Sequence, residues 1–190
     1  MTIGVLALQG DFREHQQTLD SINVENIQVR KIADLDRCRG LIIPGGESTV
    51  IQKLAVAFDL FDELSTRIRN GLPTFGTCAG LIMLADRIID GIPGQQGFGG
   101  LNISVRRNAF GNQLDSFEAD LSFAGIESAV HAAFIRAPIV ESVGEGVEVL
   151  SQLDDGRVVA VRQGHLMGIS FHPEVTGENR IHQLFVDSIL

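Results

Sequence analysis

Apolar and polar positions along the first half of the chain follow two different patterns. Residues 3–8 form a continuous apolar run, which is typical of a strand buried on both faces of a sheet. Residues 11–22 instead show a helical pattern. The two patterns continue to alternate as far as residue 89. They predict strands at residues 3–8, 27–32, 40–44 and 73–77, and helices at residues 11–22, 49–69 in two pieces, and 79–89.

The second half of the chain is richer in predicted strands. Several are joined by short glycine turns such as Asp155-Gly156, which is a hairpin signal. The expected strands are residues 102–106, 117–121, 132–136, 147–152, 158–162 and 167–171, and residues 177–190 are predicted to form a helix. Alternation of strands and helices in the first half favours a parallel sheet covered by helices. We therefore expect an α/β fold of three layers, in which a mixed sheet has helices on both faces and an antiparallel addition.

Length and charge narrow the class of protein. The chain has 190 residues, which suits one domain with a full core, and no repeat or linker divides residues 1–190. The net charge is −9 and the 15 Lys and Arg residues are scattered, so nucleic-acid binding is not expected. No apolar stretch of about 18 residues is present to span a membrane. The first residues lack the basic segment of a signal peptide, so we expect a cytoplasmic protein.

The two cysteines, Cys38 and Cys78, differ in their sequence context. Cys78 lies in Gly76-Thr-Cys78-Ala-Gly80, between a predicted strand and a predicted helix, which has the form of a nucleophile elbow with Cys in place of Ser. Glycines on either side permit the sharp turn, because a Cβ there would clash. The helix N-terminus favours the thiolate, and the Ala79 N–H becomes a donor to an oxyanion. The alternative is a small buried core residue, which is how we interpret Cys38.

His172 is the candidate base among five histidines. It lies in Phe171-His172-Pro173-Glu174, and a proline favours an extended conformation for the residue before it. Residues two apart in extended chain point to the same side, so Glu174 is expected to accept from one ring nitrogen while the other faces the thiol. A surface turn without chemistry is the alternative. The remaining histidines are expected to be structural or at the surface, although His15 and His165 could approach the site or an interface.

A glycine turn follows the strand predicted at residues 40–44. In Pro44-Gly-Gly-Glu-Ser-Thr49, either Ser48 or Thr49 suits the N-cap of the next helix. The two glycines let the backbone approach a ligand and direct N–H groups toward it. A phosphate-binding loop and a plain turn remain alternatives for this segment, although the Lys of a Walker motif is missing.

Three of these segments together resemble the class I, or triad-type, glutamine amidotransferases: Pro-Gly-Gly-Glu-Ser, Gly-Thr-Cys-Ala-Gly and Phe-His-Pro-Glu. Further segments look like the family of glutaminase subunits of pyridoxal 5'-phosphate synthase: Leu8-Gln-Gly-Asp-Phe-Arg-Glu-His15, Arg107-Asn-Ala-Phe-Gly111, Asp115-Ser-Phe-Glu-Ala119 and Phe134-Ile-Arg-Ala-Pro138. The resemblance runs nearly end to end. One departure is Asn112-Gln113, where the family often has Arg-Gln, so a surface or interface contact near Asn112 is expected to differ.

The resemblance implies a flavodoxin-like fold and a set of site residues. It implies Cys78 as the nucleophile, His172 as general base and acid, and Glu174 as the carboxylate that orients the imidazole. The oxyanion hole would use Gly46 and Ala79. The positions that match the family's glutamine contacts are Gly46, Glu47, Ser48, Arg107, Ile135 and Arg136.

The resemblance also implies a reaction and a partner. Glutamine would be hydrolysed to glutamate and ammonia. The ammonia would pass, within a hetero-oligomer, to a (β/α)8-barrel synthase subunit that makes pyridoxal 5'-phosphate from ribose 5-phosphate and glyceraldehyde 3-phosphate. This chain itself is expected to bind neither a cofactor nor a metal. The alternatives are a glutaminase of another pathway, a cysteine peptidase on a related fold, and a non-catalytic regulatory homologue.

Overall fold

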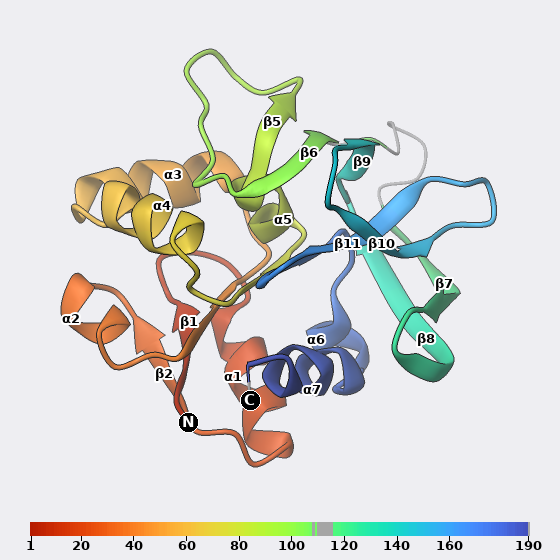
Figure 1. Cartoon of the computed structure of the whole chain (residues 1–190), viewed down its shortest axis with the longest axis horizontal. Helices are drawn as coiled ribbons and strands as arrows, with labels where there is room; N and C mark the ends of the chain where they lie inside the picture. Colours follow the sequence, from red (N-terminus) through yellow and green to blue (C-terminus); the bar gives the residue numbers. More distant parts are fainter. Residues whose placement is uncertain (108, 110–115, 190) are drawn as a thin grey trace.

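A mixed sheet of ten strands forms the centre of the described part of the chain (Figure 1). The computed structural model describes residues 1–107, 109 and 116–189. One half of the sheet is parallel, and in it a strand from the C-terminal part of the sequence lies beside the strand that precedes Cys78. The order in this half is β2 (Asn26–Val29), β1 (Ile3–Leu6), β3 (Gly40–Ile43), β4 (Thr74–Thr77) and β12 (Leu166–Ile169).

The other half of the sheet is mainly antiparallel. It continues from β12 through β11 (Val158–Gln163), β9 (Ile139–Val143), β6 (Leu101–Arg106) and β5 (Ala85–Ile89), and β10 (Glu148–Gln152) also pairs with β11. A separate antiparallel hairpin is formed by β7 (Ser116–Phe123) and β8 (Ile126–Ile135).

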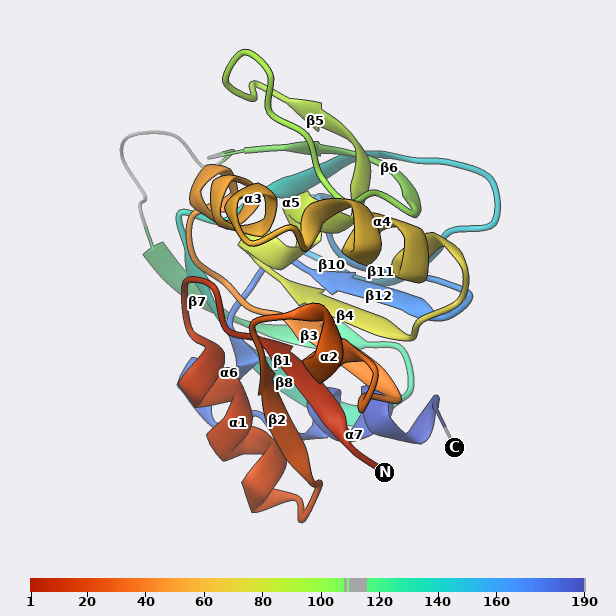
Figure 2. The ribbon, with the colours of Figure 1, turned by 90° about the vertical axis from the view of Figure 1, so that its left-hand side faces the viewer.

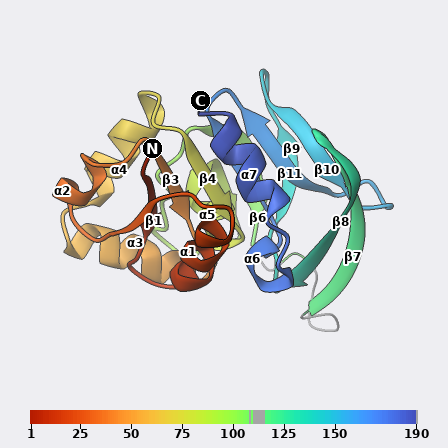
Figure 3. The ribbon, with the colours of Figure 1, turned by 90° about the horizontal axis from the view of Figure 1, so that it is seen from below.

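Helices cover both faces of the sheet (Figure 2). The first face carries α2 (Ile32–Leu35), α3 (Ser48–Ala57), α4 (Phe61–Arg69) and α5 (Ala79–Leu84). The opposite face carries α1 (Phe12–Ser21), α6 (Pro173–Thr176) and α7 (Arg180–Asp187), together with the hairpin. On this face α6 contacts both α1 and β8 (Figure 3). The predicted α/β fold with a mixed sheet and helices on both faces is confirmed.

Burial on both faces explains the continuous apolar strands. In β3, Leu41 and Ile43 contribute to the core beneath α3 and α4, whereas Ile42 contributes to the core beneath α1 and α7. Successive residues of a strand point to opposite faces, so a central strand with two covered faces needs apolar residues at every position. None of the helices in the described ranges has the length and apolar character needed to cross a membrane.

The helix predicted for residues 79–89 was partly wrong. The helix α5 ends at Leu84, and Ala85 turns extended with ψ 139° to begin β5, which pairs in parallel with β6. Four elements were not predicted: α2, β9, and, next to the site, β5 and the single turn of α6. The elements β5, β9 and α6 depend on packing or pairing with distant residues, which local periodicity does not report, whereas α2 is a single turn of four residues.

Candidate active site

Cys78 occupies the predicted elbow between β4 and α5. Its φ of +48° and ψ of −102° are uncommon for a residue with a Cβ, and its N–H donates to the Ile169 carbonyl of β12 at 2.8 Å. The nearby glycines are required by contact. A Cβ on Gly80 would lie 2.1 Å from the Ile43 oxygen, and one on Gly76 would lie 2.5 Å from the Gly80 carbonyl. The turn therefore places the sulfur at the carboxyl end of β4, at the start of a helix.

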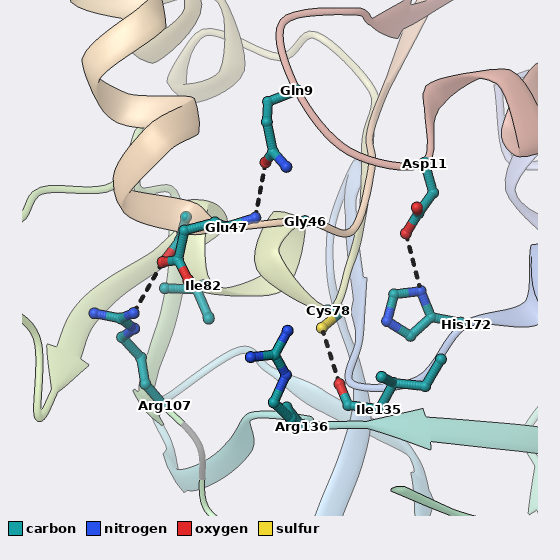
Figure 4. Close-up of a pocket in the computed structure, with 11 residues that line it drawn as sticks. Gln9, Asp11, Gly46, Glu47, Cys78, Ile82, Arg107, Ile135, Arg136 and His172 are labelled. Atoms are coloured by element: carbon teal, nitrogen blue, oxygen red, sulfur yellow. Dashed lines mark hydrogen bonds and ion pairs between the residues drawn. The ribbon is translucent and has the colours of Figure 1, made fainter. Parts of the chain in front are cut away.

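His172 and Glu174 form a buried pair. The Nδ1 of His172 donates to Oε1 of Glu174 at 2.7 Å, which leaves the other ring nitrogen free to serve the Cys78 sulfur beside it (Figure 4). Burial alone would lower the pKa of His172. Interactions with Cys78 and Glu174 outweigh burial and raise that pKa to about 10. The imidazole is thus set up to hold a proton beside the Cys78 sulfur.

The local geometry behind this pair differs from the prediction. His172 is the N-cap of α6, with φ −115° and ψ 86°, and Pro173 is the first helical residue. Glu174 therefore lies on a helical turn and not on an extended segment, because proline at a first helical position is already set for the helix. Gly177 ends the turn with φ +71°. The predicted contact forms, but the extended-chain argument for it was wrong.

Glu174 is buried, and its two oxygens have unequal surroundings. Burial raises the pKa of its carboxyl group, an effect that the hydrogen bond from His172 opposes. While Oε1 accepts from His172, Oε2 has no hydrogen-bond partner within the described residues. Asp11 adds a second carboxylate nearby, with Oδ2 at 3.6 Å from the His172 Nδ1.

A cavity of about 390 Å³ opens in front of the Cys78 sulfur. Figure 4 shows Glu47 and Arg107 on one side of it and His172 on the other. The predicted site residues that line it are Gly46, Glu47, Ser48, Cys78, Arg107, Ile135, Arg136 and His172. Ala79 follows Cys78 at the start of α5, and Glu174 lies behind His172.

Charged and amide side chains form a connected network on the far side of the cavity. One Arg107 nitrogen donates to Glu47 Oε1 at 2.9 Å, and another donates to Gln95 Oε1 at 2.8 Å. Gln95 in turn donates to the Ser48 hydroxyl at 2.9 Å. The N-cap of α3 is Glu47, whose carboxylate accepts from the Thr49 N–H at 3.4 Å, so neither Ser48 nor Thr49 is the cap. Glu47 therefore joins a helix end to the positive charge of Arg107.

The glycine loop after β3 is held from the opposite side by residues that follow β1. The Asp11 N–H donates to the Gly45 carbonyl at 3.2 Å, and the Gln9 side chain accepts from the Glu47 N–H at 2.7 Å. Gly10 fits between them, since a Cβ there would lie 1.7 Å from the Gly45 oxygen. In a trans peptide the N–H points opposite to the C=O, so the Gly46 N–H is directed away from Asp11.

The end of β8 closes the cavity. The Cys78 thiol donates to the Ile135 carbonyl at 4.0 Å, a long contact to sulfur. Arg136 follows with φ +44°, a second residue in the left-handed region beside the sulfur. The strained backbone lets Ile135 present its carbonyl to the cavity while its side chain remains 41% exposed.

Comparison with known proteins decides the family. Residues 5–190 match the SNO glutamine amidotransferase family. This chain belongs to that family. It is 58% identical to the pyridoxal 5'-phosphate synthase subunit PdxT of Nocardioides sp., over 99% of this chain and 96% of the relative. It is 57% identical to the PdxT of Clavibacter sepedonicus, over 98% of this chain and 90% of the relative. A crystal structure of a glutamine amidotransferase superimposes with a TM-score of 0.92 at 48% identity, covering 98% of both chains.

Sequence reasoning missed several side chains of the amidotransferase site. Gln9, Asp11 and Ile82 line the cavity, and Gln95 joins Arg107 to Ser48. The available signal for Gln9 and Asp11 was their position after β1, because ligands of open α/β sheets bind beyond the carboxyl ends of the strands. Gln95 gave no such signal. The predicted change near Asn112 lies outside the described residues.

One cluster in the amidotransferase has the composition of a metal site. Ligand atoms of Asp11, His172 and Glu174 all lie within 4.8 Å of one another. The His172 Nδ1 is already bonded to Glu174 at 2.7 Å, however, and a metal ligand at that nitrogen would have to lose its proton. The arrangement suits an orienting hydrogen bond for acid–base chemistry.

Proposed function

We propose that this chain is the glutaminase subunit of pyridoxal 5'-phosphate synthase. It would hydrolyse L-glutamine to L-glutamate and ammonia through a γ-glutamyl thioester on Cys78. The observation that supports this most directly is the strained elbow of Cys78 beside the His172–Glu174 hydrogen bond at 2.7 Å, in a glutamine amidotransferase. Relatives of similar length carry the name of that subunit, which supports the choice of pathway.

The proposed chemistry has two halves. The Cys78 thiolate attacks the carboxamide carbon of glutamine, and His172 gives its proton to the departing nitrogen, so that ammonia leaves and the thioester remains. His172 then takes a proton from water, which attacks the thioester and releases glutamate, and the Cys78 thiolate returns beside the protonated imidazole. Glu174 keeps the ring in the required tautomer and stabilises its protonated form, and the raised pKa of His172 fits that role.

Backbone donors and charged side chains would hold the substrate. The N–H groups of Gly46 and Ala79 are the proposed oxyanion hole, since Ala79 begins α5 and Gly46 lines the cavity. Glu47 and Arg107 offer opposite charges for the α-ammonium and α-carboxylate of glutamine. The other proposed glutamine contacts are Ser48, Ile135 and Arg136.

The proposed partner is a (β/α)8-barrel synthase subunit in a hetero-oligomer, which consumes the ammonia with two sugar phosphates. We place the chain in the cytoplasm and treat residues 1–190 as a single domain, without a metal or cofactor of its own. The two alternatives are a glutaminase subunit that supplies another pathway and a non-catalytic regulatory homologue.

The test is ammonia release at saturating glutamine, with and without excess synthase subunit. We further propose that docking of the synthase completes the oxyanion hole at the Gly45-Gly46 loop. The wild type should then be slow alone and at least about tenfold faster with the partner, because one oxyanion donor is worth about 10²–10³ in rate. Cys78→Ala should lose activity on the order of 10⁴-fold, and Cys38→Ala should keep it. Retained hydrolysis in Cys78→Ala would rule out the assigned nucleophile. Equal wild-type rates with and without the synthase would contradict the proposed activation.

A further inference from the structure

A pair of histidines lies buried behind the proposed catalytic carboxylate. His15 comes from α1 and His182 from α7, and both are 0% exposed. The His15 Nδ1 is 2.8 Å from the His182 Nε2, while the His15 Nε2 is 3.1 Å from the Thr77 hydroxyl and 3.7 Å from the Glu174 Oε2. Thr77 is the residue before Cys78. This imidazole pair therefore connects the back of the site to the core without touching the cavity.

The proton positions of the pair follow from its surroundings. Burial lowers the pKa of both rings, that of His182 to about 3, so each ring is neutral and carries one proton. If His15 donated through Nδ1, the His182 Nδ1–H would be buried without an acceptor, and a bare His15 Nε2 would face the Glu174 carboxylate. If His182 donates through Nε2, the His182 Nδ1 is only an unused acceptor, and the His15 Nε2–H points toward Thr77 and Glu174. The second arrangement avoids both penalties.

We propose that His15 is a positioning residue that directs its Nε2–H at the second oxygen of Glu174, with His182 fixing the His15 tautomer. The inference rests on the proposed orienting role of Glu174. It accounts for the Oε2 atom, which is buried and without a hydrogen-bond partner within the described residues. The 3.7 Å between the His15 Nε2 and the Glu174 Oε2 is too long for a hydrogen bond. The N–H dipole still favours a negative charge on Oε2, because both side chains are buried away from water.

The consequence concerns the charge on Glu174. Its neighbours are His172, which bonds to Oε1, Asp11, whose negative charge opposes ionisation, and His15 on the Oε2 side, with His182 behind it. Burial already favours the protonated acid, which is a weaker acceptor for the His172 N–H and has no charge to stabilise the imidazolium. The His15 dipole shifts the balance toward the carboxylate. Without it, Glu174 takes up its proton at higher pH, and the imidazole then loses the charged acceptor that orients it and stabilises its protonated form.

The decisive comparison is between His15→Gln and His15→Asn. A glutamine amide reaches the place of Nε2 and keeps a donor toward Glu174, whereas the shorter asparagine reaches only the place of Nδ1. Glutamine hydrolysis in the complex with the synthase subunit is measured as kcat/KM from pH 5 to 9. For His15→Asn, the acid limb should move up by about half to one pH unit, somewhat less than a full hydrogen bond to a charged group would give. His15→Gln should recover at least half of that shift, and His182→Leu should give an intermediate one.

Two further variants separate the possible failures. Leu19→Ala weakens the packing of α1 without touching Glu174, so it should leave the acid limb in place. Glu174→Gln tests the underlying role and should lower kcat at every pH. If Glu174→Gln is impaired but His15→Asn and His15→Gln share the wild-type acid limb, the proposal for His15 is wrong. Full activity in Glu174→Gln would instead remove the proposed orienting carboxylate. If His15→Asn does not fold, an unshifted acid limb in His182→Leu overturns the proposal.

Discussion

At the scale of single residues, Cys78 combines backbone strain with chemical use. A non-glycine residue in such a sparsely populated conformation costs on the order of 1–3 kcal/mol. The surroundings hold it there, through the hydrogen bond from its N–H to Ile169 and the tight contact between Gly80 and the Ile43 carbonyl. The strain turns the thiol toward the cavity and leaves the first N–H groups of α5 unpaired for an oxyanion.

Arg107 carries a prediction at the same scale. It pairs with Glu47 and Gln95 at the edge of the cavity, so Arg107→Ala should remove a charged contact to glutamine and free the Glu47 side chain. The KM for glutamine should rise about 10- to 150-fold with little change in kcat, as expected for the loss of a charge-assisted hydrogen bond. Steady-state kinetics with the synthase present measure this.

The neighbouring arginine is a matched control for Arg107. Arg106 forms its ion pairs with Asp90 and Glu141 at the surface, outside the cavity. Arg106→Ala should therefore leave the KM unchanged. An Arg107→Ala variant whose KM equals that of Arg106→Ala would show that Arg107 only braces the loop.

Which site residues were predictable depended on how local their signals are. The elbow of Cys78 was predictable, because its signal, glycines two residues on either side of a cysteine between a strand and a helix, is contained in one short segment, even though the contact that requires Gly80 comes from Ile43 of β3. Gln95 was not, because its contacts to Ser48 and Arg107 join segments that are separate in sequence. His15 has no carboxylate two residues further on, as His172 does, and it meets Glu174 only through the packing of α1 against α6.

At the scale of elements, the predictions held where the pattern was set by burial and failed where it was set by pairing. The apolar runs of β1, β3, β4 and β12 were predictable, because both faces of these strands are covered. The strand β5 was predicted as helix, since only its pairing with β6 holds Ala85–Ile89 extended. The turn of α6 was missed because Pro173 both favours an extended His172 and begins a helix.

The close contact of Gly80 at the junction of β4 with α5 leads to a prediction about stability. In Gly80→Ala, the new methyl carbon would meet the Ile43 carbonyl at 2.1 Å, and a backbone atom of a central strand cannot move aside. The free energy of unfolding should fall by at least about 3 kcal/mol, the upper part of the usual cost of overpacking, and glutaminase activity should be lost. The urea midpoint measures the change. Gly91→Ala, whose methyl would contact only the side chains of Gln95 and Ile88 at 3.2 Å or more, should unfold near the wild-type midpoint. A Gly80→Ala midpoint equal to it would disprove the contact argument.

At the scale of the whole molecule, the buried histidines make stability depend on pH. Burial lowers the pKa of His182 to about 3 and also lowers that of His15, so below pH 6.5 the unfolded chain binds protons that the folded rings refuse. Each ring then lowers the free energy of unfolding by up to about 1.4 kcal/mol per pH unit as the pH falls. Glu174 acts in the opposite sense, because its raised pKa lets the folded state bind a proton first. The pKa of His172 is raised from 6.5 to about 10, so its contribution to the free energy of unfolding is complete below pH 6.5 and is lost as the pH rises toward 10.

The pH dependence of stability can be tested by comparing wild type with His182→Leu. From pH 7 to pH 5, the free energy of unfolding of wild type should fall by about 2 kcal/mol more than that of His182→Leu, which has one fewer buried ring to protonate. Urea denaturation at the two pH values measures both losses. Parallel losses in the two proteins would mean that His182 does not titrate on unfolding.

The position of β12 beside β4 has a consequence for when the enzyme becomes active. The strand that ends at the nucleophile gains this neighbour, and the histidine that follows it, only from the far end of the sequence. Pairing between such distant segments is slow and comes late in folding. A chain that ends between Cys78 and Ile169 contains the cysteine but has neither the carbonyl that holds its backbone nor the proposed base His172. Copies that end in this interval would thus lack the proposed His172 and Glu174, and we expect glutamine hydrolysis only from chains that extend past both residues.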